Sequence, residues 1–167
     1  MVVQQVKDDA KVIDIADARA VRYIIAIKSE RDIDQLTLWL ASRTYLRKMH
    51  LSLVHVVKPG WLDRDPDSGL AGARMLSQME LNTVKNLAML ENGASILREQ
   101  FPHVEVDYWI KVGDPIEVLP EIARTISADA MLVFGCSGDD RPFWDRSFSQ
   151  LVANKCPCPL ECFSPRN

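Results

Sequence analysis

The 167-residue sequence lacks the features of a membrane protein or a nucleic-acid-binding protein. No apolar run approaches the roughly 20 residues that a membrane span needs, and residues 1–20 contain no apolar signal segment. The formal net charge is -3, without a cluster of Lys and Arg, whereas binding to a phosphate backbone depends on clustered cations. We therefore expect a cytoplasmic protein with no membrane or nucleic-acid partner.

The sequence is also poor in cysteine, and its four cysteines are Cys136, Cys156, Cys158 and Cys162. They are too few and too bunched for a disulfide framework in a chain long enough to build a core, so reduced thiols are expected. Their Cys-x-Cys-x3-Cys spacing matches no common zinc motif. We expect no metal.

No catalytic constellation stands out either. Gly135-Cys-Ser137-Gly138 does not have the Gly-x-Ser-x-Gly spacing of a nucleophile elbow, and all three histidines precede it, contrary to the serine, acid, histidine order of that motif. His55, inside an apolar segment, is more typical of a satisfied core histidine. No motif places a pair of carboxylates for acid and base catalysis. We therefore predict that the protein is not an enzyme and assign no catalytic residue.

What the sequence does contain is one α/β domain. Continuous apolar runs at 23–27, 51–57 and 130–134 predict buried strands. Residues 103–112 alternate apolar and polar, which is typical of an edge strand with one wet face, and 160–163 reads as a last strand entered through prolines. Residues 1–20 show no sustained period and form an N-terminal arm, so the domain is expected over residues 21–167.

Helical signals lie between these strands. Ser29 precedes an amphipathic segment, Asp114 and Pro115 form an N-cap and first helical position, and another helix is expected at 146–155. An apolar stripe from Leu76 to Leu97 predicts a long helix, preceded by a loop at 61–73. The pattern predicts a Rossmann-like, five-stranded parallel sheet in the order 3-2-1-4-5 with helices on both faces. Such sheets bind ligands at the switch point between strands one and four.

From residue 21 to 163 the chain resembles the universal stress protein family. The matching segments, in order along the chain, are Ile-Ile-Ala-Ile27, Leu-Val-His-Val-Val57, Val-Gly-Asp-Pro115, Ser-Ala-Asp-Ala-Met-Leu-Val-Phe-Gly135 and Pro-Cys-Pro159. The resemblance implies a flavodoxin-like fold, commonly a homodimer. Some members of the family bind ATP or AMP and others do not.

The nucleotide-binding members carry a Gly-x2-Gly-x9-Gly-Ser/Thr loop, which Gly135 and Gly138 match at its first two glycines. Anchoring the following helix on its Pro-Cys-Pro end aligns Arg146 and Ser147 with the last pair, so the hydroxyl is kept and the glycine is lost. Counting nine residues instead reaches Phe148 and Ser149, again without the glycine. The added Phe143 and Trp144 could fill the space of a base or triphosphate.

Three further candidate residues come from the first two strands. The resemblance places Lys28 where nucleotide-binding members have an aspartate that contacts adenosine, and Val56 where a residue lines the adenine pocket. Ala26 precedes them in the first strand. Lys28 and Arg146 are either solvated cations at the mouth of the cleft or an anion clamp. The nucleotide- or anion-binding candidates are thus Ala26, Lys28, Val56, Gly135, Gly138, Arg146 and Ser147.

Two functions remain open from the sequence. One is a regulatory protein of the stress response that acts as a homodimer with an unidentified protein partner and has a degenerate nucleotide pocket. The other is a sensor that binds adenine nucleotide, ATP or AMP. No cofactor is expected in the first case, and a nucleotide or phosphate is expected in the second. The lost aspartate and glycine predict weak ATP binding, or none.

Overall fold

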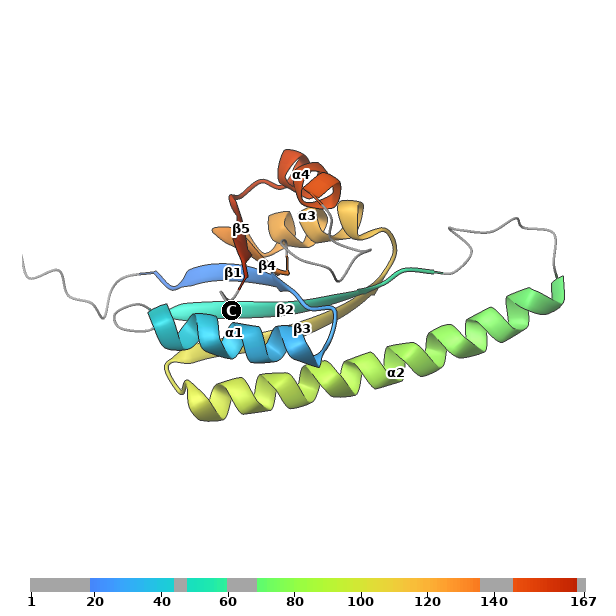
Figure 1. Ribbon diagram of the computed structural model, residues 1–167, viewed down its shortest axis with the longest axis horizontal. Helices are drawn as coiled ribbons and strands as arrows, with labels where there is room; N and C mark the ends of the chain where they lie inside the picture. The colour runs from blue at the N-terminus through green and yellow to red at the C-terminus, as the bar shows by residue number, and fades with distance from the viewer. Residues whose placement is uncertain (1–18, 44–47, 60–68, 136–145, 165–167) are drawn as a thin grey trace, which may run out of the picture.

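A five-stranded parallel sheet in the order β3-β2-β1-β4-β5 forms the centre of the molecule (Figure 1). The computed structural model describes residues 19–43, 48–59, 69–135 and 146–164, without the side chains of 69–77 and 146–147. The predicted sheet, its strand order and the edge position of the third strand are confirmed. The strands are β1 (Val21–Ala26), β2 (Met49–Val57), β3 (Val104–Val112), β4 (Ala130–Phe134) and β5 (Leu160–Phe163).

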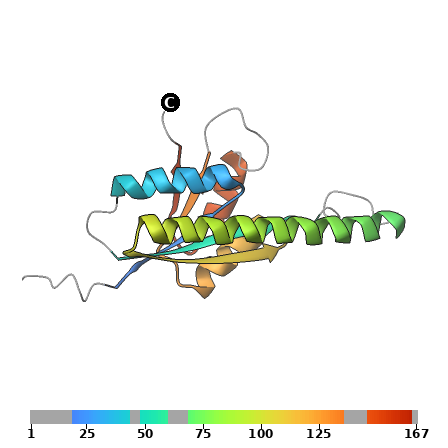
Figure 2. The ribbon, with the colours of Figure 1, turned by 90° about the horizontal axis from the view of Figure 1, so that it is seen from below.

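Helices cover both faces of this sheet, as predicted. The helices are α1 (Glu30–Arg43), α2 (Gly69–Gln100), α3 (Pro115–Thr125) and α4 (Arg146–Lys155). Helices α1 and α2 lie on one face, and α3 and α4 lie on the other (Figures 1 and 2). Helix α3 begins as predicted, because the Asp114 carboxylate accepts a hydrogen bond from the N–H of Ile116 at 2.9 Å and Pro115 follows it.

The central strands are buried on both faces. Ile25 and Leu132 lie opposite each other in register and are fully buried in the core under α1 and α2. Their neighbours Ile24 and Met131 point to the other face and are buried under α3 and α4. Because successive strand residues point to opposite faces, a strand covered on both sides must be apolar throughout. This explains the continuous apolar runs of β1 and β4.

Helix α2 is longer than the sequence pattern indicated. The loop predicted at 61–73 is wrong for residues 69–73, since the helix already begins at Gly69. Leu70, Ala71 and Ala73 favour helix enough to offset the two glycines. The amino-terminal half of α2 runs past the carboxyl ends of the strands (Figures 1 and 2).

The other half of α2 is anchored on the sheet. Leu90, Ala94 and Leu97 are fully buried in the core. Gly93 allows α1 to approach closely, because a Cβ at this position would lie 2.8 Å from Cδ1 of Ile33. A side chain at position 93 would therefore force Ile33 on α1 to move.

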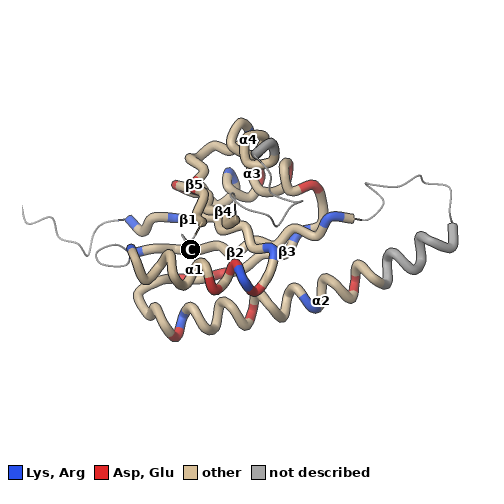
Figure 3. The backbone as a smooth tube through the Cα atoms, viewed as in Figure 1, with Lys and Arg blue, Asp and Glu red and all other residues tan. Residues whose placement is uncertain are grey.

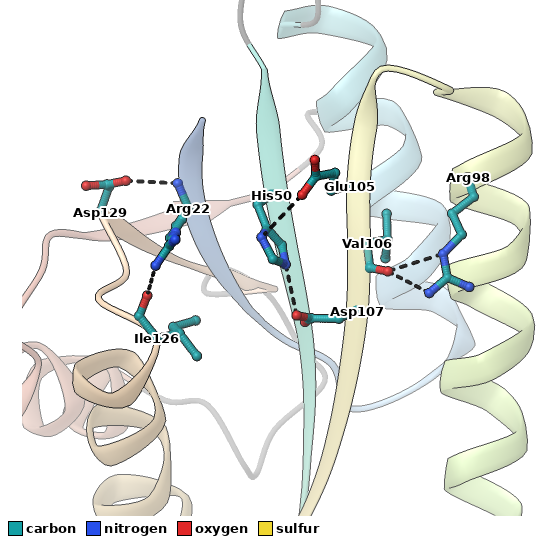
Figure 4. A network of polar contacts seen from close by, with 8 residues as sticks. All are labelled: Arg22, His50, Arg98, Glu105, Val106, Asp107, Ile126 and Asp129. Atoms are coloured by element: carbon teal, nitrogen blue, oxygen red, sulfur yellow. Dashed lines mark hydrogen bonds and ion pairs between the residues drawn. The ribbon is translucent and has the colours of Figure 1, made fainter. Parts of the chain in front are cut away.

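The edge strand β3 carries polar contacts on its wet face and on its free edge (Figure 4). His50 Nε2 lies 2.8 Å from Oδ2 of Asp107, which links β2 to β3. The Arg98 guanidinium on α2 donates to the carbonyl oxygen of Val106 from Nη2 at 2.6 Å and from Nε at 3.2 Å. A backbone carbonyl at the edge is thus satisfied by a side chain, which protects the edge from pairing with another chain.

The cysteines fit the prediction only in part. Cys156 and Cys158 are free thiols with their sulfurs 3.2 Å apart, and burial, aided by this contact, raises the pKa of Cys158 to about 12. Cys162 is disulfide-bonded, so the prediction of reduced thiols is wrong for this residue. Its partner lies outside the described residues. Sequence spacing could not reveal this bond, because disulfide pairing depends on distances in the folded chain.

Two further findings concern the described parts of the chain. No helix there is both long enough and apolar enough to cross a membrane. No three His, Cys, Asp or Glu side chains there are grouped so that they could hold a metal ion. Of the N-terminal arm, Arg19 is described, and its guanidinium lies 3.3 Å from Oδ1 of Asp129.

Candidate functional site

A pocket of about 310 Å³ opens at the carboxyl ends of β1 and β2. No described residue of β4 lines it, so it lies beside the predicted switch point between β1 and β4 and not in it. Its apolar walls come from the two strands and from α3. Its polar groups come from β2, from the segments that follow the two strands and from α2. The apolar lining includes Ala26, Val54, Val56, Pro115 and Leu119, and the polar lining includes Lys28, His55, Lys58, Asn82 and Asn86.

Three of the predicted site residues, Ala26, Lys28 and Val56, line this pocket. A fourth, Gly135, lies close to it: a Cβ built on Gly135 would be 3.8 Å from the Lys28 Nζ. The Lys28 ammonium therefore lies beside the first glycine of the loop after β4. The structure brings these four residues together at one end of the sheet.

The remaining predicted residues cannot be placed in the site. Gly138 lies outside the described residues, as do Phe143 and Trp144. Arg146 and Ser147 begin helix α4, but their side chains are not among those described. Whether these residues meet the pocket therefore stays a prediction.

Gly135 has a backbone conformation that explains its residue type. Its φ is +73°, in the left-handed region that only glycine adopts at little cost. Its N–H donates to the carbonyl oxygen of Phe163 at 3.2 Å, so the turn is tied to the end of β5. A tight turn at the end of β4 is thus sufficient reason for this glycine, whether or not a ligand binds.

A buried carboxylate lies beside the pocket at the start of α1. The Asp32 side chain accepts a hydrogen bond from the backbone N–H of Lys28 at 2.7 Å, and the residue is 4% exposed. Burial raises the pKa of Asp32, while the hydrogen bond from Lys28 N–H and the Lys28 charge act in the opposite direction. This acid lies four residues after the position where the family has its adenosine-binding aspartate. Asp32 is buried and does not line the pocket, so it does not replace that aspartate there.

His55 lies in the wall of the pocket. Its Nδ1 is 2.8 Å from the carbonyl oxygen of Ile27, which requires Nδ1 to carry the proton and donate. Burial lowers the pKa of His55, and the bond to Ile27 and the charge of Asp32 oppose this shift. The lowered pKa favours the neutral imidazole at pH 7. The histidine is satisfied by this hydrogen bond, as interpreted, but it is half-buried in the pocket wall and does not belong to the core.

Sequence reasoning missed the two amides of the site. Asn82 and Asn86 lie one turn apart on α2, on the side of the helix that faces the pocket. The polar positions within the stretch of Leu76 to Leu97 gave a weak signal for them, but their distance from the strand ends could not be inferred from spacing. Together with the two lysines, these amides can hydrogen-bond a polar ligand whose flat apolar part fits between Val56 and Leu119.

Comparisons with known proteins identify the family and the fold. The sequence model of the Universal stress protein family matches residues 16–162. Universal stress protein UspA from Lactobacillus plantarum superposes with a TM-score of 0.65 at 14% identity, covering 88% of this chain and 99% of that one. No protein of curated function matches the sequence significantly.

Two similar structures contain a nucleotide. A universal stress protein family protein from Arabidopsis thaliana, with AMP bound, has a TM-score of 0.56 at 17% identity and covers 87% of this chain and 92% of that one. The universal stress protein from Archaeoglobus fulgidus, in complex with dAMP, has a TM-score of 0.52 at 20% identity and covers 85% of this chain and 96% of that one. At these identities the likeness shows the fold alone.

Proposed function

Since the chain belongs to the universal stress protein family, we propose that it is a regulatory protein that binds an adenine nucleotide of the size of AMP in the pocket at the ends of β1 and β2. The observation that carries this proposal is the pocket itself. Its volume of about 310 Å³ lies at the lower end of the range for small-molecule sites.

The shape and chemistry of the pocket favour this ligand class. The side chains of Ala26, Val56 and Leu119 offer an apolar site for a planar base, and the amides of Asn82 and Asn86 offer donors and acceptors to a sugar. The ammonium of Lys28 is suited to an anionic group. The AMP and dAMP held by the two similar structures belong to the same class of ligand.

The pocket also differs from that of nucleotide-binding members in a way that weakens binding. Lys28 has the opposite charge to the adenosine-binding aspartate, and no described carboxylate lines the pocket in its place. We propose a dissociation constant for AMP that is weaker than about 1 μM. The pocket therefore differs in charge from that of the nucleotide-binding members, but the residues that the structure describes leave it open.

We further propose that the protein is not an enzyme and acts by association, in the cytoplasm, in the response to stress. The hydrogen bonds of Asp32 and His55 support this proposal. Asp32 accepts a backbone hydrogen bond, and His55 donates its Nδ1 proton to Ile27, so each has a structural role. Association is proposed to involve a homodimer and a further protein partner.

Isothermal titration calorimetry with AMP tests the binding proposal. We expect AMP to bind the wild type and Val56→Trp, which fills the pocket, to weaken binding at least about tenfold. Val84→Trp is the matched control, because Val84 is 67% exposed on α2 and does not line the pocket. An absence of binding by AMP, ADP and ATP at millimolar concentration would contradict the proposal, and so would unchanged binding by Val56→Trp.

A further inference from the structure

A second cavity, of about 670 Å³, adjoins the first. It lies between the start of α1 and the middle of α2 and shares Lys28 and Asn86 with the nucleotide pocket. The two cavities are therefore neighbours, with these two residues at their boundary. Nothing in the family resemblance points to this region, since the family's phosphate loop follows β4.

The charge of this cavity is unusual for a chain with a net charge of -3. Its lining includes three cations, Lys28, Arg31 and Lys85, and one acid, Glu30. They come from the segment before α1, from α1 and from α2, and Figure 3 shows basic positions on both helices. Lys58, in the lining of the first pocket, adds a fourth cation. Cations that line a cavity in this way concentrate anions there.

The cations outnumber the acids at this cavity, because three cations accompany Glu30 alone in its lining and Asp32, which interacts with the charges of Lys28 and Arg31, lies outside it. Asp32 does not line the second cavity, and its Oδ2 is engaged with the Lys28 N–H. The polar lining beyond the charged side chains consists of the Ser29 hydroxyl and the amides of Asn86 and Asn92, which can donate hydrogen bonds to an anion. The cavity therefore offers charge-assisted and neutral donors from two helices.

We infer that this second cavity binds the phosphate of the nucleotide, with Lys85 and Arg31 as its ligands, while the nucleoside occupies the first pocket. This inference rests on the proposed function and names the path of the phosphate within it. The path through the loop after β4 is disfavoured, because the last glycine of the family pattern is missing from the sequence. Asn86 lines both cavities. In the inferred arrangement its side chain would lie near the bond between the sugar and the phosphate.

The test compares ligands that differ in phosphate alone. Calorimetry with adenosine and with AMP gives the ratio of their affinities, which reports the contribution of the phosphate. We expect Lys85→Gln to weaken AMP about tenfold and to change adenosine binding less than about twofold. Arg31→Gln should act in the same direction, and Lys85→Arg should retain most of the AMP affinity. Lys85 and Arg31 are both exposed, so the variants should fold.

Lys48→Gln is the matched control, because Lys48 is exposed at the amino end of β2, at the opposite end of the sheet. An unchanged ratio of AMP to adenosine affinity in both Lys85→Gln and Arg31→Gln overturns the inference. The inference is also overturned if Arg146→Gln loses AMP affinity while Lys85→Gln keeps it. That result assigns the phosphate to the start of α4. Adenosine binding that persists in either case leaves the proposed function intact.

If neither adenosine nor AMP binds the wild type, the proposed function fails, and inorganic tripolyphosphate then tests the cavity alone. Tripolyphosphate binding that is lost in Lys85→Gln and kept in Lys48→Gln supports the anion site. An absence of tripolyphosphate binding to the wild type at low ionic strength overturns the site as well, since screening is weakest there.

Discussion

The backbone N–H of Lys28 donates to Oδ2 of Asp32 across 2.7 Å, and this bond ties the end of β1 to the first turn of α1. Lys28 lines both the pocket at the ends of β1 and β2 and the adjoining cavity. The position of Lys28 in both cavities therefore depends on a buried carboxylate. The backbone of a candidate binding residue is held in place by an acid that the sequence pattern did not mark.

Replacing this acid should destabilise the fold. We expect Asp32→Ala to lower the free energy of unfolding by about 1–3 kcal/mol, because it leaves the Lys28 N–H without its partner. Asp34→Ala on the same helix is the control, since Asp34 is exposed and should stay within about 0.5 kcal/mol of the wild type. Equal urea midpoints for the two variants would contradict a structural role for the bond.

The sheet centre gives a second stability prediction. Ile25→Ala and Leu132→Ala should each cost about 2–5 kcal/mol, because both side chains are fully buried and face each other across β1 and β4. Leu38→Ala provides the comparison, as Leu38 is 58% exposed on α1. Urea unfolding followed by circular dichroism measures the difference. A loss below about 1 kcal/mol at either core position would be inconsistent with the packing described.

His55 should make stability depend on pH. Its pKa is lowered by burial from 6.5, so the unfolded chain takes up a proton at a higher pH than the folded chain does. Stability should therefore fall as pH drops through 6.5 towards the folded pKa, and level off below it. His55→Gln should reduce the fall between about pH 7.5 and 5.5, whereas His103→Gln, at an exposed histidine, should keep it. If His55→Gln and the wild type show the same pH dependence, protonation of His55 does not cause the loss of stability.

The altered pocket gives a prediction for ATP. The Lys28→Asp, Arg146→Gly double variant restores the acid and the glycine of the family pattern, and we expect it to bind ATP at least about tenfold more tightly than the wild type. Lys48→Asp tests whether a charge change of the same kind far from the pocket has any effect. If the double variant binds ATP more weakly, the cations at these two positions instead contribute to holding the phosphates.

The free edge of β5 is predicted to pair across a two-fold axis in a homodimer. The carbonyl oxygens of Pro159 and Phe163 accept hydrogen bonds from Met131 and Gly135, so the backbone groups of Leu160 point to the outer edge of the sheet. Leu160→Pro therefore removes an edge donor without breaking the pairing with β4, and it should dissociate the dimer. Leu160→Val keeps the backbone N–H and should leave the dimer intact. Light scattering that shows a monomeric wild type at micromolar concentration would contradict this prediction.

The sequence by itself determined the sheet. Apolar runs around Ile25 and Leu132 predicted central strands, and the alternation from Glu105 to Lys111 predicted the edge. These patterns are local consequences of burial, since a strand covered on both faces must be apolar and a strand with one wet face need not be. The family segments placed Ala26, Lys28 and Val56 at the pocket for the same reason, because they lie at the ends of recognisable strands.

Tertiary structure decided the rest of the site. Asn82 and Asn86 reach the pocket from a helix that begins well after β2 ends, and Arg31 and Lys85 meet at one cavity although they are far apart in sequence. Helical periodicity gives the face on which a residue lies but not the neighbour that this face meets. The disulfide of Cys162 depended likewise on distances in the folded chain. Local patterns indicated which residues are buried, whereas the packing of α2 beside the strand ends and α1 decided which polar groups line the two cavities.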